Sequence, residues 1–183
     1  MLAGDLRLLQ QSGLPEHHRR GLTERVTSAL GFIGLLAREA LQASNRHYPE
    51  LGEEIARLRS GFSAGDLAGS ALRLQQIGQR YPLDTRGFLP VVATPVRLAR
   101  GRELYTSTCR ACHIAPDTRR RNPARDLFHD AETMPAQEFL ARLMGGVRGV
   151  PETGLENPLS DEDLRALLAW FMRDREDAPG FGG

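Results

Sequence analysis

One short segment of the sequence carries residues that can hold a cofactor covalently: Cys109, Cys112 and His113, spaced as C-x-x-C-H. Two thiols three positions apart on one helical turn can each form a thioether with one vinyl group of a porphyrin. The adjacent imidazole is then placed to bind the iron from the proximal side. Because the chain has no other cysteine, we expect this segment to hold one covalently attached haem c.

Two other interpretations of the same residues are disfavoured by the surrounding sequence. A C-x-x-C pair before a helix can be a thioredoxin-like redox site, in which the helix dipole activates the first thiol. A zinc site would need two further ligands at suitable spacing. The sequence contains neither a second C-x-x-C nor an H-x-x-x-H. The neighbouring segments, described next, are typical of neither a βαβ unit nor a zinc ribbon.

Two amphipathic helices are predicted on either side of the cysteines. Residues 97–108 place Gly101 and Tyr105 on the helical face that leads to the motif. A second helix is expected after Ser160, a preferred N-cap residue that is followed by an acidic first turn. Because glycine permits a close approach of two backbones, we expect Gly101 and Tyr105 to cross the second helix near Trp170.

This arrangement resembles the class I c-type cytochromes over residues 95–175. In that family the first helix carries glycine and an aromatic residue just before C-x-x-C-H, and it crosses a C-terminal helix that bears an aromatic residue. Asn122-Pro123 resembles the family's Gly-Pro, whose proline carbonyl accepts a hydrogen bond from the proximal histidine and raises its basicity. The resemblance therefore implies that Pro123 belongs to the cofactor-binding residues. Residues 138–146 resemble the family's third helix, which ends in glycine.

The sequence departs from the family at the sixth ligand of the iron. A Met-Pro pair typically follows the terminal glycine of the third helix by about four residues and supplies a methionine sulfur. Counting from Gly146 leads here to Val150-Pro151. A hydrocarbon side chain cannot bind iron, so we expect the family's ordinary methionine ligand to be absent and the sixth position to be open or occupied by water.

Other residues remain candidates for that position. Met134 precedes Pro135 at the expected start of the third helix, where polar caps are preferred. Family analogy places Met134 near the haem edge, which makes it the candidate sulfur ligand of the iron. The other candidates are His129 or an N-terminal histidine such as His47, which would offer nitrogen, and Glu156 or Asn157, which would offer oxygen.

Composition excludes some partners. The chain of 183 residues is 40% hydrophobic and 26% charged, as expected of a globular protein. Its formal net charge of +1 indicates neither a nucleic-acid partner nor an anionic membrane, and we expect no transmembrane segment. A local cluster of Arg119, Arg120, Arg121 and Arg125 follows the haem motif. It can pair with propionates, form part of a docking face, or be a solvated loop.

The first 94 residues are expected to form a separate helical bundle. Apolar residues recur at helical spacing over 22–44, 51–58 and 66–81, with a turn expected at 61–63. The proline-rich stretch between Tyr81 and Pro95 is interpreted as a linker. The predicted fold is therefore mostly α: a cytochrome c-like helical haem domain over residues 95–183, preceded by a small helical bundle and linker over residues 1–94.

The resemblance implies a monohaem c-type cytochrome that transfers electrons in the bacterial periplasm, with redox proteins as partners. Such a protein would be an electron carrier or an electron-transfer subunit of an oxidoreductase. Export is expected, although Met1 to Gln10 lacks the basic start and apolar stretch of a signal peptide. The sequence indicates no oligomeric state.

Two alternative functions remain open at this point. In the first, an open sixth site binds or turns over a small ligand, such as NO, CO or a small oxidisable substrate. In the second, the N-terminal bundle docks the haem domain onto a larger oxidoreductase. Val150 favours ligand binding, whereas the family resemblance favours electron transfer.

If Cys109 and Cys112 are the attachment points, haem must stay on the chain after denaturation. Expression in a host that exports and matures c-type cytochromes should give an intact mass that exceeds the polypeptide mass by one haem. Replacing both cysteines by alanine should remove this increment, because no other residue is expected to form a thioether with the haem. A matured preparation that carries free thiols and the bare polypeptide mass would contradict the assignment.

Overall fold

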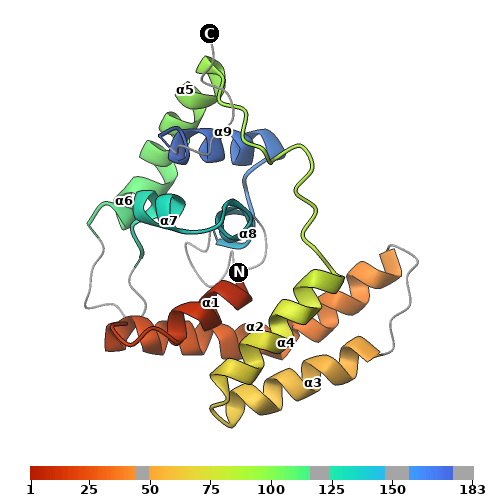
Figure 1. Cartoon of the computed structure of the whole chain (residues 1–183). Coiled ribbons are helices and arrows are strands. Elements are labelled where there is room, and N and C mark those ends of the chain that lie inside the picture. Colours follow the sequence, from red (N-terminus) through yellow and green to blue (C-terminus); the bar gives the residue numbers. More distant parts are fainter. Residues whose placement is uncertain (44–49, 116–123, 147–156, 175–183) are drawn as a thin grey trace. The chain divides into compact units, whose positions relative to one another are not determined.

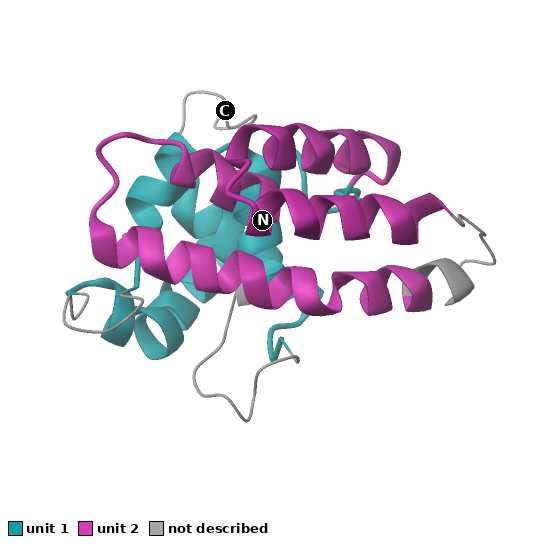
Figure 2. Ribbon diagram, turned by 90° about the horizontal axis from the view of Figure 1, so that it is seen from below, with its two compact units in different colours: residues 1, 83–117, 124–183 teal, residues 2–82, 118–123 magenta. Residues whose placement is uncertain are grey.

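The structure, a computed structural model, describes residues 1–43, 50–115, 124–146 and 157–174. Every regular element in these ranges is a helix, which confirms the prediction of a mostly α-helical protein (Figure 1). The chain forms two compact units, coloured separately in Figure 2. One unit comprises residues 2–82, and the other contains the described residues from Leu83 onward.

The first unit is a small helical bundle. Its elements are α1 (Leu2–Leu9), α2 (Glu16–Ala43), α3 (Glu50–Ser63) and α4 (Leu67–Arg80). The last three correspond to the helices expected from apolar periodicity, although α2 begins six positions before the predicted residue 22. Residues 44–49, which include the end of the helix predicted over 22–44, lie outside the described residues.

The periodic pattern does not predict α1, because eight residues span little more than two turns. Its position depends on burial and on one ion pair. Leu6 and Leu9 are buried, and Asp5, which directly precedes Leu6, is also fully buried. Arg25 on α2 donates from Nε and Nη2 to the two carboxylate oxygens of Asp5, at 2.8 and 2.5 Å. Because a buried carboxylate is costly without such a partner, this pair favours one placement of α1 on α2.

The turn expected at residues 61–63 is wrong. Helix α3 continues through Ser63, and the chain turns at Ala64 and Gly65 instead. Gly65 adopts a φ of +81°, a conformation that side chains disfavour. Gly61 lies within α3, where a Cβ atom would stand 3.4 Å from Oγ of Ser70 on α4. The glycine at 61 therefore serves close packing of α3 and α4, and the glycine at 65 makes the turn.

The second unit contains all the elements that surround the cysteine motif. They are α5 (Pro95–Leu104), the π-helical turn η1 (Tyr105–Cys109), α6 (Arg110–His113), α7 (Leu127–Thr133), α8 (Ala136–Gly146) and α9 (Asp161–Phe171). Helix α7 was not among the predicted helices. Sequence signals set several helix starts: Thr94 caps α5, Asp126 caps α7, and Ser160 forms a capping box with Asp163 at α9.

Helices α5 and α9 cross at Gly101, as predicted (Figure 1). A Cβ atom at this position would lie 2.6 Å from Cβ of Trp170 and 2.8 Å from the carbonyl carbon of Ala166, which no real packing tolerates. Glycine is therefore required here by space alone. Leu104, one turn later on α5, is buried in the same core as Leu167 and Leu168 of α9.

Phe171 joins the other helices of this unit to the crossing. Its ring meets those of Tyr105, Phe128 and Phe139 edge to face, with centroid distances of 5.6, 5.1 and 5.5 Å. These partners come from η1, α7 and α8 respectively. Each such ring pair stabilises by about 0.5–1.5 kcal/mol beyond the area it buries. The last residue of α9 thus connects the motif helix to the two helices that follow it.

The stretch before α5 packs on this same core. Val91 is buried, and Phe88, Leu89 and Ala93 are partly buried against the cluster. Arg165 of α9 donates from Nε to the carbonyl of Gly87 at 2.7 Å and lies over the ring of Phe88. The sequence prediction of a linker up to residue 94 remains untested as a domain boundary, but these contacts favour a start of the second unit near Leu83.

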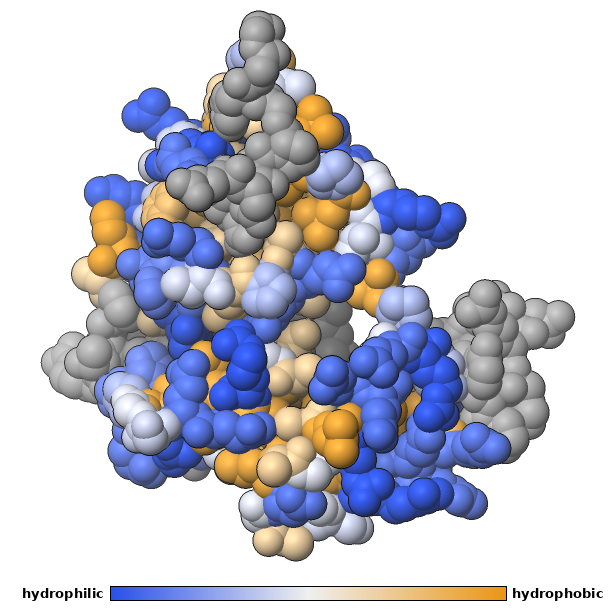
Figure 3. All heavy atoms as spheres, in the orientation of Figure 1, coloured by the Kyte–Doolittle hydropathy of each residue, from blue (hydrophilic) through white to orange (hydrophobic). Residues whose placement is uncertain are grey.

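On the face drawn in Figure 3, charged and polar residues predominate and apolar residues are exposed in small areas. Within the described ranges, none of the helices combines the length and apolarity needed to cross a lipid bilayer.

The close crossing at Gly101 predicts a large effect of a single methyl group. Gly101→Ala should lower the free energy of unfolding by about 1–3 kcal/mol, because overpacking outweighs the gain of about 1 kcal/mol in helix propensity. Gly31→Ala on α2 is the matched control. No heavy atom outside the local helix lies within 4 Å of a Cβ at Gly31, so that variant should be stabilised by about 0.5–1 kcal/mol. Urea denaturation followed by circular dichroism measures both, and a neutral Gly101→Ala would contradict the packing.

The contacts of Phe88, Leu89 and Val91 predict where an independent haem domain begins. A chain that starts at Leu83 and one that starts at Thr94 should differ in thermal stability when both are matured with haem. Loss of these three side chains should remove at least about 2 kcal/mol of burial, which lowers Tm by about 8 °C or more in a domain of this size. Equal melting temperatures would show that residues 83–93 are a linker after all.

Candidate haem site

The helix that leads into the cysteine motif changes its pitch just before it. After α5, the amide of Arg110 donates to the carbonyl of Tyr105, which makes one π-helical turn over Tyr105–Cys109. The hydroxyls of Thr106 and Ser107 donate to carbonyls one turn earlier, at 2.8 and 2.9 Å. Hydroxyl groups bonded in this way bend helices, and π-turns often occur at functional sites. The α-helix predicted over residues 97–108 therefore ends in a wider turn.

The two thiols are free and differ in exposure. Cys109 is half-buried, whereas Cys112 is exposed. Burial raises the pKa of the Cys109 thiol above its ordinary value, and the neighbouring Cys112 adds to that rise. A redox-active or nucleophilic first cysteine would need a lowered pKa. The raised pKa of Cys109 therefore disfavours the thioredoxin-like interpretation.

No group of three or more metal-ligating side chains gathers anywhere in the described ranges, whether His, Cys, Asp or Glu. The zinc interpretation consequently has no ligand set among these residues. Cys112 and His113 remain available for another cofactor.

The ring of His113 is oriented by one short hydrogen bond. Its Nδ1 lies 2.5 Å from the backbone carbonyl oxygen of Arg125. A carbonyl oxygen can only accept, so Nδ1 carries the proton and donates. The lone pair of the imidazole is then on Nε2, the atom that a metal would bind. This arrangement is that of a histidine prepared to be a metal ligand.

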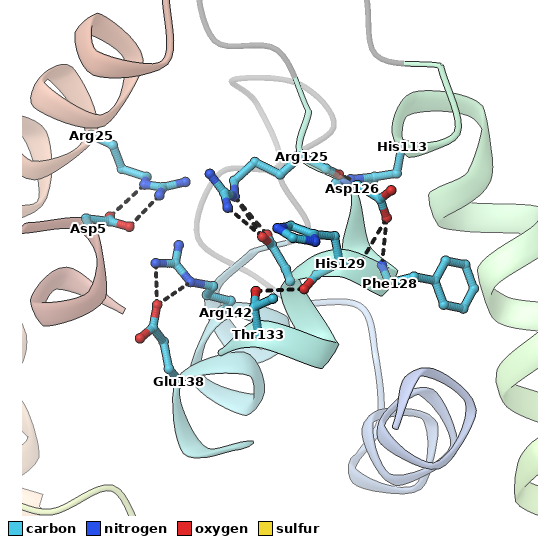
Figure 4. A network of polar contacts seen from close by, with 11 residues as sticks. Asp5, Arg25, His113, Arg125, Asp126, Phe128, His129, Thr133, Glu138 and Arg142 are labelled. Atoms are coloured by element: carbon cyan, nitrogen blue, oxygen red, sulfur yellow. Dashed lines mark hydrogen bonds and ion pairs between the residues drawn. The ribbon is translucent and has the colours of Figure 1, made fainter. Parts of the chain in front are cut away.

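Arg125 is in turn held by a buried acid (Figure 4). Its Nε and Nη2 donate to the carboxylate of Asp130 at 2.8 and 2.6 Å. Asp130 lies in the first turn of α7 and is only 3% exposed. At the start of the same helix, Asp126 accepts from the amides of Phe128 and His129 at 2.9 and 3.1 Å. The residue that accepts the hydrogen bond of His113 is thus held by an acid in the first turn of α7.

The residue expected from the sequence to accept the hydrogen bond of His113 is not the one that the structure shows. Pro123, expected to accept the hydrogen bond from the histidine, lies outside the described residues. The acceptor that the structure describes is the carbonyl of Arg125, which the sequence did not predict in that role. Backbone carbonyls carry no residue signature, although the capping residue Asp126 marks the start of a helix at this point. Arg119, Arg120 and Arg121 also lie outside the described residues.

Met134 was expected at the start of the third helix, and the structure places it two residues before α8, which begins at Ala136. It is the C-cap of α7, with its amide bonded to the carbonyl of Asp130 at 3.0 Å. The next helix, α8, begins after Pro135, whose carbonyl accepts from Glu138 and Phe139. The Met134 side chain is only 3% exposed. Its role as an iron ligand remains a prediction.

The other candidates for the sixth ligand separate into two groups. Val150, Pro151, Glu156 and His47 lie outside the described residues. His129 is exposed on α7. Asn157 donates from Nδ2 to the carbonyls of Leu143 and Met144, at 3.0 and 2.9 Å, and accepts from the amide of Leu159. Asn157 therefore caps the end of α8, which is sufficient reason for an amide side chain at this position.

The residues around the motif fit a covalently bound haem. Two unpaired thiols, separated by one helical turn, are followed by an imidazole whose Nε2 is left for a metal by the hydrogen bond at Nδ1. In a haem site the imidazole nitrogen would bind the iron and the two sulfurs would bond to the porphyrin. This donor set therefore suits haem better than a bare metal ion.

Comparisons with known proteins agree with this chemistry. Residues 96–171 match the family model described as cytochrome c oxidase, cbb3-type, subunit III. The match runs from α5 to the last residue of α9 and includes the cysteine motif. The chain is also 29% identical over 140 residues to Photosystem II extrinsic protein V of Synechococcus sp. (strain JA-3-3Ab), a similarity that covers 66% of the chain and 77% of the relative. No solved structure gives a significant match to the chain.

Proposed function

Residues 96–171 are a class I-like c-type cytochrome domain, and from this premise we propose that the protein transfers single electrons through one covalently bound haem c in the bacterial periplasm. The observation that carries the proposal is the C-x-x-C-H segment, whose histidine is already oriented by the carbonyl of Arg125. When bound, the haem supplies an iron that alternates between the ferrous and ferric states.

In this proposal the thiols of Cys109 and Cys112 attach the cofactor. Each thioether forms by addition of S–H across one vinyl group, so the hydrogen moves to the vinyl carbon and nothing is released. The reaction needs reduced thiols, and both cysteines are free. Their separation of one turn follows directly from the helical conformation of η1 and α6.

His113 serves as the proximal ligand in this scheme. Donation from its Nδ1 to the carbonyl of Arg125 selects the tautomer that leaves Nε2 for iron. The bond also keeps the ring in one orientation in both oxidation states. A fixed ligand reduces the structural change that accompanies gain or loss of an electron.

The packing around the motif also supports rapid electron transfer, because it limits structural change when the cofactor gains or loses an electron. Tyr105, at the start of η1, contacts Phe171 and Phe128 edge to face. Gly101, one turn earlier, lies against the backbone of α9. Close packing of this kind resists rearrangement, so the residues around the cofactor are expected to stay in place when its charge changes.

Periplasmic location and redox protein partners are the remaining parts of the proposal. Thioether attachment to C-x-x-C-H takes place on the outer side of the bacterial inner membrane. The relative identified above is named an extrinsic protein, which supports action outside the bilayer. An electron carrier needs a donor and an acceptor, and both are proposed to be redox proteins that approach the haem domain.

A second candidate function is binding or turnover of a small ligand at an open sixth site. Val150 favours it, since this residue stands where the family's methionine is expected. Asn157 also favours it, because its amide group is engaged in capping α8. NO, CO or a small oxidisable substrate are the ligands that such a site would accept.

A spectroscopic titration of the matured full chain separates the two functions. Electron transfer predicts one reversible, single-electron step per chain. Because Val150 stands at the position of the family's methionine, the ferric protein should lack the sulfur-to-iron absorption band of His/Met cytochromes. Val150→Met should create that band by supplying the missing ligand. Val150→Leu is the matched control, since it adds bulk without sulfur and should leave the band absent.

Carbon monoxide gives the deciding measurement. A high-spin ferrous protein that binds CO readily in the wild type, and loses this in Val150→Met, would favour the ligand-binding function. A chain that holds haem but shows no reversible electron uptake would contradict electron transfer. A wild type with the sulfur band would direct attention to Met134, and Met134→Ala should then remove it.

A further inference from the structure

The proximal hydrogen bond depends on a backbone atom outside the helices. Arg125 belongs to the irregular residues 124–126 that precede α7. Its carbonyl oxygen nevertheless lies 2.5 Å from Nδ1 of His113, twelve positions earlier in the chain. Helical hydrogen bonding does not fix a carbonyl at this place, so some other contact must hold it.

The side chain of the same residue provides that contact. The guanidinium of Arg125 binds the carboxylate of Asp130 through two nitrogens, at 2.8 and 2.6 Å (Figure 4). Two parallel bonds restrict the orientation of an arginine more than one bond does. The side chain of Arg125 therefore transmits the position of Asp130 to its own backbone.

Asp130 is itself rigidly placed. Its amide donates to the carbonyl of Asp126 at 3.0 Å, and its carbonyl accepts from Met134 at 3.0 Å. The carboxylate is inside the protein, with the residue only 3% exposed. A buried acid of this kind keeps its place because leaving the arginine would cost several kcal/mol.

We propose that the ion pair between Arg125 and Asp130 positions the carbonyl that receives the Nδ1 proton of His113, and so tunes the basicity of the proximal ligand. Neither residue touches the iron; both act through the hydrogen bond. The inference rests on the proposed role of His113 as iron ligand. A stronger bond at Nδ1 makes the imidazole a better electron donor and stabilises the ferric state.

Because the acceptor is a backbone carbonyl, an indirect effect of Arg125 and Asp130 on His113 can be tested separately from any direct contact with the cofactor. A backbone carbonyl persists whatever side chain stands at position 125. Replacing the side chain of Arg125, or the acid of Asp130, therefore keeps the accepting atom and is expected to change its position and the local charge. A change in the solvent exchange rate of the Nδ1 proton of His113 would indicate that the acceptor carbonyl has moved.

The test uses the matured full chain and the variants Asp130→Asn and Arg125→Lys. In the ferrous protein, with CO added if it is high-spin, the Nδ1 proton of His113 should exchange with solvent at least tenfold faster in both variants. The reduction potential should rise, by about 59 mV for a tenfold change in the relative stability of the two oxidation states. Asp130→Glu keeps the carboxylate and should restore much of the wild-type exchange rate.

The pair Glu138 and Arg142 on α8 supplies a matched control. Arg142 donates to Glu138 at 2.7 Å, and the two side chains are 12–13% exposed. Glu138→Gln makes the same change of charge in the same unit, away from the hydrogen bond of His113. It should leave the exchange of the His113 proton unchanged, whatever small effect it has on the potential.

The outcomes distinguish this inference from the function on which it rests. A wild type that carries no haem overturns the proposed function. A wild type with haem, whose His113 proton exchanges at the same rate in Asp130→Asn and Glu138→Gln, overturns the positioning role alone. If Asp130→Asn does not fold, Arg125→Lys decides by itself, since it keeps the charge and loses only the paired geometry.

Discussion

The crossing of α5 and α9 at Gly101 is the contact on which the second unit, which carries the cysteine motif, depends. It brings two helices that are about sixty positions apart in the chain to backbone contact, because Gly101 lies against Ala166 and Trp170. Arg97 and Arg100 of α5 then reach Glu162 and Asp163 in the first turn of α9, at 2.6 and 2.9 Å. These exposed pairs add little stability. The absence of a side chain at Gly101 decides the geometry, and the ion pairs follow from it.

The same crossing determines how rigidly the cysteine motif is held. Phe171 at the end of α9 collects rings from η1, α7 and α8 around one centre. The motif therefore begins on a packed helix, while its histidine is held by the residue that leads into α7. The helix that leads into the motif and the helix that follows Arg125 thus both contribute rings to the same aromatic cluster. Such an arrangement suits a protein whose cofactor changes charge without a change in the surrounding structure.

The side chains of the site suit the proposed attachment and ligation of a haem. Burial raises the pKa of the Cys109 thiol, so this cysteine is protonated at neutral pH. His113 has a fixed tautomer that leaves one nitrogen for a metal. Asn157, a possible oxygen ligand on sequence grounds, is used to cap α8 instead. The side chains to which a chemical role is proposed thus lie within the C-x-x-C-H segment.

Local spacing is what the sequence could determine alone. The order Cys109, Cys112, His113 needs no tertiary information, and the space required at Gly101 could be foreseen because helical periodicity places it on the apolar face. The turn was misplaced at residues 61–63, since two nearby glycines look alike until packing shows that Gly65 takes the positive φ. The carbonyl of Arg125 and the buried pair of Asp5 with Arg25 were decided only by the tertiary structure. Both join residues that are distant in the chain, and a backbone oxygen or a single buried acid leaves no periodic pattern in a sequence.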